Sequence, residues 1–356
     1  MRYDDTAYMF SSARIRAMEN RMLSAEACEK FLGARSSDDI LNSLNEFGCR
    51  IITVQGPDGT RVDREASLMT MLEDAFRDVT EMLPTPEAVR FLQYKYDCNN
   101  IKSLLKCHAR GVEPDGMLSA AASVPVEQLR AAVDANDFSL LPQHMAEAAA
   151  LARETYLRTA DAQCIDLILD RACYADMAET ARASGVPFAI QYVSKTADLT
   201  NALMCLRVLR MGGDRGLQLL EQALLEGGEV EKQQWLAVCE GGETALWSFL
   251  SGTQTKTAGV GAEKQTGRTG AAPECCVALA AKCGKTSSLA DCERAADAVM
   301  MDFIRGAKWL PFGAELATAY LAALEYGIKN LRIIMAGKDA GQDIALIRER
   351  LRDMYV

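Results

Sequence analysis

The side chains best suited to chemistry in this 356-residue chain are cysteines, because it contains twelve cysteines and only two histidines. The cysteines stand at positions 28, 49, 98, 107, 164, 173, 205, 239, 275, 276, 283 and 292. None forms a Cys-x-x-Cys pair, so the usual spacing of a zinc site is missing. Several fall within helical patterns, where free cysteine acts as a small apolar residue. We expect reduced thiols in a cytoplasmic protein, and only the cluster of Cys275, Cys276, Cys283 and Cys292 leaves another role open.

A second candidate is phosphate binding at Gly284-Lys285-Thr286, which resembles the end of a P-loop. That motif needs a glycine five positions earlier, where the chain has Leu279, and a strand in front, where residues 274–282 read as helical. Gly259-x-Gly261 likewise lacks the third glycine of a dinucleotide fingerprint, since Lys264 takes its place. The sequence therefore predicts neither a nucleotide nor any other cofactor.

Acid–base chemistry has few candidates, because His108 and His144 lie far apart in the sequence. Cys107 is adjacent to His108, but neighbours on a helix point about 100° apart. The acidic residues between 291 and 302 are spread around a helix, as on a solvated face. Glu-x-x-His pairs for a two-metal helical bundle are also missing. We therefore expect no catalytic site and no metal site, and we do not expect an enzyme.

One polar pattern recurs along the chain. Asp97-x-x-Asn100-Ile101-x-x-x-Leu105-Lys106 aligns with Asp198-x-x-Asn201-Ala202-x-x-x-Leu206-Arg207, and glycines 111 and 212 close both segments at the same distance. A weaker third copy is Asn330-Leu331-Arg332-Ile333-Ile334, whose helix we expect to end early at Gly337. Three copies, each late in a helical block, indicate an internal triplication.

The repeated aspartate lies one helical turn before the asparagine, so both side chains share one face of a helix. Such a pair can hold the end of a neighbouring helix as a polar pin, or it can be part of a ligand or ion site. No histidine or other reactive group accompanies the pairs, which favours the pin. The predicted structural motif therefore consists of Asp97, Asn100, Asp198, Asn201, Asn330 and Arg332.

The composition points to helices packed on helices. Good helix formers are abundant, whereas prolines number nine and aromatic residues make up 6%. The net charge of −10 argues against a general nucleic-acid binder, which needs a basic face. No run of 18 apolar residues occurs, and the charged N-terminus does not resemble a signal peptide.

Helical patterns cover most of the chain. They run from about Tyr3 to Met22, onward from a cap at Ser24, over 36–47, over 63–82, and from Thr85 to a stop at Gly111. Residues 51–54 are β-like and end at the turn 56–59, either as a short extended piece or as a link between helices. Residues 252–273 are rich in Gly, Thr and Ala, so we expect a flexible loop there. We divide the chain into domains at 1–112, 113–214 and 215–356.

Segments spread over the whole chain resemble the C subunit of A/V-type rotary ATPases, which is related to the d subunit of the eukaryotic vacuolar ATPase. These segments are Ala13-Arg14-Ile15-Arg16-Ala17-Met18-Glu19 with Met22-Leu23-Ser24, Tyr94-Lys95-Tyr96-Asp97-x-x-Asn100-Ile101-Lys102-x-Leu104-Leu105-Lys106, Phe312-Gly313-Ala314-Glu315 with Tyr320, the third asparagine segment, and the ending from Ile347 to Val356. One departure concerns the acidic residue three before the third asparagine, where this chain has Gly327, with Glu325 two residues earlier.

The resemblance implies an all-α fold of three similar helical domains around a pseudo-threefold axis, shaped like a funnel. It implies a non-catalytic rotor part that joins the central-stalk subunits of the soluble ATPase head to the membrane proteolipid ring. Such a part transmits torque for proton or sodium transport or ATP synthesis. The chain would be cytoplasmic, without nucleic acid, and would meet the membrane only through the ring.

Two other hypotheses stay open from the residues alone. A generic helical-repeat adaptor is disfavoured, because solenoid repeats usually span about 20–50 residues and the spacing here is far longer. A helical enzyme using the cysteine cluster or the Asp–Asn pairs predicts bound metal, or activity that is lost when Cys275 or Asp97 is replaced.

Overall fold

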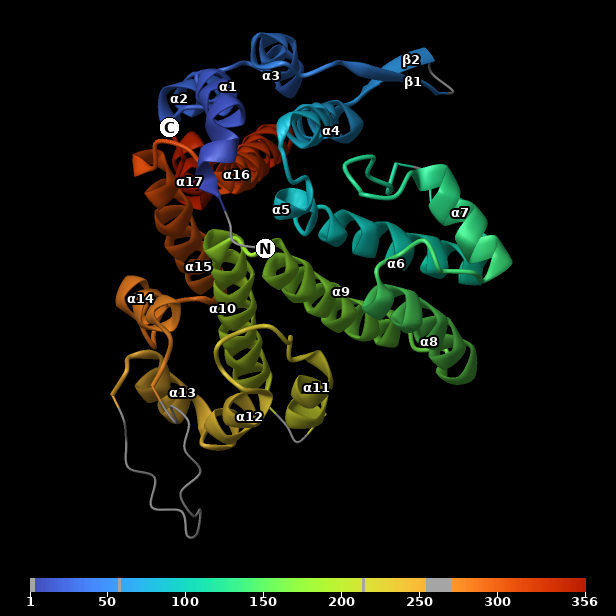
Figure 1. Cartoon of the computed structure of the whole chain (residues 1–356), viewed down its shortest axis with the longest axis vertical. Helices are drawn as coiled ribbons and strands as arrows, with labels where there is room; N and C mark the ends of the chain where they lie inside the picture. The colour runs from blue at the N-terminus through green and yellow to red at the C-terminus, as the bar shows by residue number, and fades with distance from the viewer. Residues whose placement is uncertain (1–3, 57–58, 115, 213–214, 254–270) are drawn as a thin grey trace.

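The computed structural model describes residues 4–56, 59–114, 116–212, 215–253 and 271–356 (Figure 1). Over these residues the chain forms seventeen α-helices, three short 3-10 helices and one two-stranded antiparallel sheet, which confirms the predicted all-α class. The greater part of the loop expected at 252–273 lies outside the described residues, as do residues 57 and 58 of the predicted turn. Within the described ranges, none of the helices combines the length and the hydrophobicity that a membrane span requires.

Figure 1 shows three groups of helices. The upper group joins the two ends of the chain: α1 (Met9–Glu19), α2 (Ala25–Leu32), α3 (Ser37–Ser43), α4 (Arg64–Met82), α16 (Ala314–Asp339) and α17 (Ile344–Arg350). The right-hand group holds α6 (Tyr94–Arg110), α7 (Val126–Ala135), α8 (Gln143–Thr159) and α9 (Gln163–Ser184). The lower group holds α10 (Pro187–Met211), α11 (Arg215–Ala223), α12 (Lys232–Glu240), α13 (Gly242–Leu250) and α14 (Glu274–Lys282).

The remaining elements connect these groups. Helix α5 (Glu87–Arg90) leads into α6, and α15 (Leu289–Arg305) leads toward α16. The 3-10 helices are η1 (Asp5–Tyr8), η2 (Leu44–Phe47) and η3 (Gly306–Trp309). Strands β1 (Ile52–Gly56) and β2 (Gly59–Asp63) pair from Ile52 with Asp63 to Gly56 with Gly59. The β-like run is therefore one strand of a hairpin.

Most predicted helix starts agree with the structure. The Ser24 side chain accepts a hydrogen bond from the Ala27 N–H at the start of α2, and Ser36 does the same for α3. A further cap, which was not predicted from the sequence, is the reciprocal capping box of Ser288 and Asp291 at the start of α15. These caps use backbone donors that a helix leaves unpaired in its first turn, which is why short polar residues mark the boundaries.

Two predicted helix boundaries are wrong. The helix expected from Thr85 onward is interrupted, because α5 ends at Arg90 and α6 begins only at Tyr94. The third repeated helix does not end at Gly337, because α16 continues to Asp339. A Cβ atom at Gly337 would lie 2.6 Å from Cγ1 of Ile347 on α17, so this glycine allows close packing of two helices instead of ending one.

A single apolar core runs through all three groups. Trp235 and Phe91 are among its largest fully buried side chains. Helix α16 is buried along most of its length and packs against α1, α2, α3, α4 and α5, so the last long helix completes the core of the first part of the chain.

Candidate functional site at the Asp–Asn helices and the central cavity

The side chain of Asn100 on α6 is fully enclosed and bonds one backbone unit with both of its polar atoms. Its Nδ2 donates to the Ser119 carbonyl at 2.8 Å, and the Ser119 N–H donates to its Oδ1 at 2.8 Å. This two-way pairing satisfies the amide and a loop peptide together, so the loop after α6 is fixed against that helix.

The other two repeated asparagines make the same contact. Asn201 on α10 donates to the Leu225 carbonyl at 3.0 Å and accepts from its N–H at 2.8 Å. Asn330 on α16 donates to the Arg352 carbonyl at 2.9 Å and accepts from its N–H at 2.7 Å. The partner lies 19, 24 and 22 residues after the asparagine in the three copies. The repetition seen in the sequence is therefore a repetition of contacts.

The aspartates of the first two copies bind the next stretch of backbone. Asp97 accepts from the N–H of Ser123 at 3.2 Å, from its hydroxyl at 2.6 Å and from the N–H of Val124 at 3.0 Å, just before α7. Asp198 accepts from the N–H groups of Glu229 at 2.8 Å and Val230 at 3.2 Å. Burial raises the pKa of both carboxyls to about 6, while these hydrogen bonds oppose the rise.

The third copy lacks this acid. Gly327 on α16 faces a small apolar space, where a Cβ atom would lie 3.7 Å from Cβ of Leu23. Met22, Leu23, Met71, Ile328, Leu331 and Tyr355 are among the side chains around it. Glu325 does not replace the missing acid, since it binds Lys95 and accepts a hydrogen bond from the Tyr96 hydroxyl at 2.7 Å, both on α6.

Arg332 belongs to the sequence motif but has a different kind of contact. It forms an ion pair with Glu65 on α4, and its Nη2 lies 3.2 Å from the Met69 sulfur. The two side chains are 43% and 49% exposed, so this pair lies at the surface and links α16 to α4. It does not contact the backbone segment that Asn330 holds.

Sequence reasoning missed a third buried acid of the same kind. Asp176 on α9 accepts from the N–H of His144 at 3.0 Å and of Met145 at 2.8 Å, at the start of α8. It has no asparagine one turn later, so the repeat did not reveal it. The available signal was an aspartate between Cys173 and Met177 on an otherwise apolar face.

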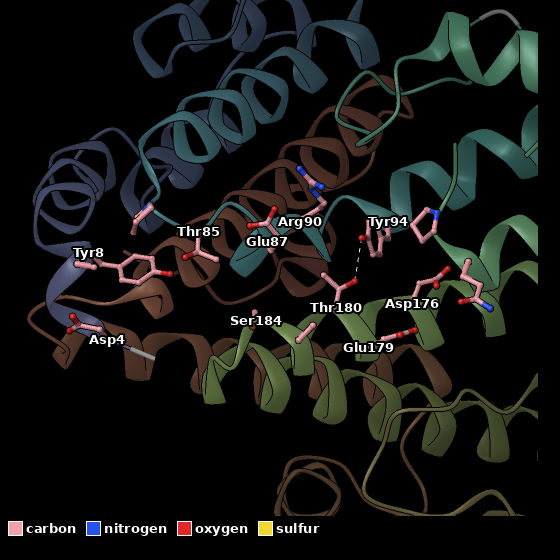
Figure 2. A pocket seen from close by; sticks show the side chains of 15 residues that line it. Asp4, Tyr8, Thr85, Glu87, Arg90, Tyr94, Asp176, Glu179, Thr180 and Ser184 are labelled. Carbon is pink, nitrogen blue, oxygen red and sulfur yellow. Dashed lines mark hydrogen bonds between the residues drawn. The ribbon is translucent and has the colours of Figure 1, made fainter. Parts of the chain in front are cut away.

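Asp176 also lines a cavity of about 580 Å³. Figure 2 shows its wall, to which η1, α5, α6 and α9 contribute labelled side chains. The lining residues are Asp4, Ala7, Tyr8, Pro84, Thr85, Glu87, Arg90, Tyr94, Pro142, Gln143, Asp176, Glu179, Thr180, Ala183 and Ser184. Thr180 donates a hydrogen bond to the Tyr94 hydroxyl at 3.2 Å, and burial raises the pKa of Tyr94. Figure 1 shows α5 and the end of α9 near the middle of the molecule, between the three groups of helices.

One group of side chains beside this cavity has the spacing of metal ligands. Atoms of His144, Asp176 and Glu179 lie within 4.8 Å of one another. Both oxygens of Asp176 already accept backbone N–H groups at the start of α8, and the positive end of a helix disfavours a cation. The arrangement fits an ion pair between His144 and Glu179, whose atoms are 3.3 Å apart, better than it fits a metal.

The cysteines are free thiols, and eleven of the twelve are buried. Cys98 with Cys173, Cys205 with Cys239, and Cys283 with Cys292 are within hydrogen-bonding reach across helices. Burial raises the pKa of the Cys283 thiol to about 12, and the pKa of Cys173 and Cys205 lies well above the usual range because of the neighbouring thiol and burial. The raised pKa keeps Cys173, Cys205 and Cys283 protonated, and these buried thiols pack as apolar side chains.

A family model described as ATP synthase (C/AC39) subunit matches residues 11–350. The chain belongs to this family. It is also 23% identical over 346 residues to the C subunit of the V-type sodium ATPase of Enterococcus hirae, with 96% of this chain and 97% of that protein covered. These findings confirm the resemblance seen in the sequence. The Asp–Asn contacts and the cavity therefore belong to a C/AC39 subunit of a V/A-type ATPase.

Proposed function

We propose that this chain is the rotor connector of a V/A-type ATPase. In this role it joins the central stalk of the soluble head to the membrane proteolipid ring and passes torque between them. The match of the C/AC39 family model to nearly the whole chain carries this proposal. The relative from Enterococcus hirae supports it, because that protein is the C subunit of a V-type ATPase and is covered almost from end to end.

A connector that transmits torque must rotate as one rigid body. A close-packed helical core resists deformation, and the apolar core here runs through all three groups of helices. The contacts of Asn100, Asn201 and Asn330 tie each long helix to a segment that follows it, so local bending would break buried hydrogen bonds. Work of this kind needs neither a cofactor nor a bond-making step in this chain.

We further propose that the three groups of helices form the funnel around a pseudo-threefold axis. The domain division at 112 and 214 stays a prediction. The asparagine contacts run from α6 to Ser119 and from α10 to Leu225, so a unit that begins at each Asp–Asn helix would keep every contact within one unit. In this arrangement the chain sits on the cytoplasmic side and meets the membrane only through the ring.

Deleting the gene in its host tests the proposal. We expect ATP hydrolysis by the soluble head to persist while ATP-driven ion uptake into membrane vesicles is lost, and we expect the wild-type chain to restore uptake. The tagged chain should also co-purify with central-stalk and ring subunits. Ion uptake that survives the deletion would contradict the connector role.

A further inference from the structure

Residues 351–356 follow α17 without forming a helix or a strand, and side chains from two helices hold their backbone. Asn330 on α16 binds both the N–H and the carbonyl of Arg352. Arg305 on α15 donates from its Nε to the Met354 carbonyl at 3.1 Å. Because this segment has no ladder of backbone hydrogen bonds of its own, its position depends on these few anchors.

Two side chains of the same segment add further anchors. Arg352 donates from its Nε to Asp297 on α15 at 2.6 Å, and the two side chains are only 14% and 19% exposed, so salt screens this pair little. Tyr355 is buried, and its hydroxyl donates to Glu19 on α1 at 3.1 Å. The ammonium group of Lys308 on η3 lies 4.6 Å from the centre of the Tyr355 ring, within the range of a cation–π contact.

The anchors lie on both sides of one boundary, which we call the α15 seam. On one side α15 packs on α10 and α14 of the lower group, and on the other side α1 packs on α16 in the upper group. The backbone crosses the seam through η3, where the Ala307 carbonyl accepts a hydrogen bond from Arg16 on α1 at 3.1 Å. Figure 1 shows α15 between the lower group and the end of the chain marked C. Residues 351–356 therefore bridge the seam a second time, through noncovalent contacts.

We propose that residues 351–356 act as a releasable clasp on the α15 seam. When the clasp is docked, it locks α15 and the lower group to the upper group, and the molecule is one stiff body. When it is released, the seam opens about η3 while the helices on both sides stay folded. Release breaks only the contacts of this short segment, so it costs less free energy than global unfolding. This inference concerns the chain by itself and goes beyond the proposed function.

Hydrogen exchange of the full chain, followed by mass spectrometry, tests the clasp. The double variant Arg352→Ala with Tyr355→Ala removes its two side-chain anchors. The control, Tyr156→Ala with Arg158→Ala, makes the same two changes on α8, which does not border the seam. We expect the amides of α1, α15 and η3 to exchange about tenfold faster in the clasp variant, and those of α6 to α9 to exchange as in wild type. In the control, only the helices around α8 should exchange faster.

Two results would overturn the inference. Unchanged exchange in α1, α15 and η3 would show that the segment does not hold the seam. Exchange that rises by the same factor in all three groups of helices would show that the segment belongs to one cooperative core and is not a clasp. If the double variant does not fold, Arg352→Ala alone keeps the buried ring of Tyr355 and should give the same local pattern with about a threefold change. Neither result bears on the ATPase role, which the gene deletion tests separately.

Discussion

Helices α6 and α16 make the same asparagine contact but differ one turn earlier. In α6 the buried Asp97 binds two backbone N–H groups, whereas α16 has Gly327 against the apolar side chain of Leu23. The segment at Ser123 and Val124 presents backbone N–H groups to α6, and these need an acceptor. The segment at Leu23 presents an apolar side chain to α16, so it needs none. The asparagine is thus the constant part of the repeat, and the acid depends on what lies opposite.

Replacing one of the repeated asparagines should have the largest effect on stability, because it removes the contact that all three copies share. Replacing Asn201 by Ala leaves the N–H and carbonyl of Leu225 buried without partners, and we expect the free energy of unfolding to fall by about 3–4 kcal/mol. Urea unfolding followed by circular dichroism measures the change. Asn100→Ala and Asn330→Ala should cost comparable amounts. A loss below about 1 kcal/mol in all three would contradict a shared structural role.

Placing the missing acid in the third copy tests the difference directly. We expect Gly327→Asp to destabilise the protein by about 2–3 kcal/mol, because its carboxylate would face apolar side chains instead of backbone N–H groups. The control Gly327→Ala should be neutral or stabilising by up to about 1 kcal/mol, since its Cβ fits and alanine favours a helix. A shift of the thermal midpoint reports both. Equal stability of the two variants would show that α16 could also use an acid.

The pH dependence distinguishes the copies that carry an acid. Burial raises the pKa of Asp198 to about 6, so the folded state holds a proton there more tightly than the unfolded state does. Stability from this group is therefore complete at the lowest pH, below the ordinary aspartate pKa, and is lost as the pH rises through about 6. We expect Asp198→Asn to reduce that loss and to cost about 1–2 kcal/mol at pH 5, where the native acid is largely protonated. Unfolding curves between pH 4 and pH 7 measure it, and a variant with the wild-type slope would contradict the assignment.

The smallest effect is expected at Arg332, which shares the motif without sharing the contact. Its ion pair with Glu65 is about half exposed on both sides, and such pairs contribute about 0–1 kcal/mol. Arg332→Ala should therefore change the unfolding free energy by less than about 1 kcal/mol, and less still at high salt. A double-mutant cycle with Glu65→Ala isolates the pair. A large coupling energy would place Arg332 among the structural residues after all.

The sequence predicted what depends on local rules. The caps at Ser24 and Ser36 follow from unpaired helix donors, and the positive φ of 65° at Gly111 follows from glycine at a helix end. Glycine alone does not stop a helix, however. At position 337 the close approach of Ile347 explains the presence of glycine better than a helix end does. That contact depends on how the chain returns, which local patterns do not contain.

The site was predicted only in part for the same reason. Asn100, Asn201 and Asn330 could be identified because their segments form a pattern that is visible in the sequence itself. The cavity is assembled from η1, α5, the starts of α6 and α8 and the second half of α9, and no spacing in the sequence places Asp4 and Glu179 on the wall of one cavity. Asp176 was missed because its partners are backbone atoms of a helix that comes earlier in the chain.

The packing of α16 against the first four helices has a consequence for synthesis. Helices α1 to α4 leave the ribosome first, but their partner α16 begins only at Ala314. At about 5–20 residues per second, the early helices wait roughly 15–60 s with their apolar faces uncovered. Exposed apolar surface on a nascent chain promotes aggregation, so the core of the first part of the chain is protected only when its last long helix has been made.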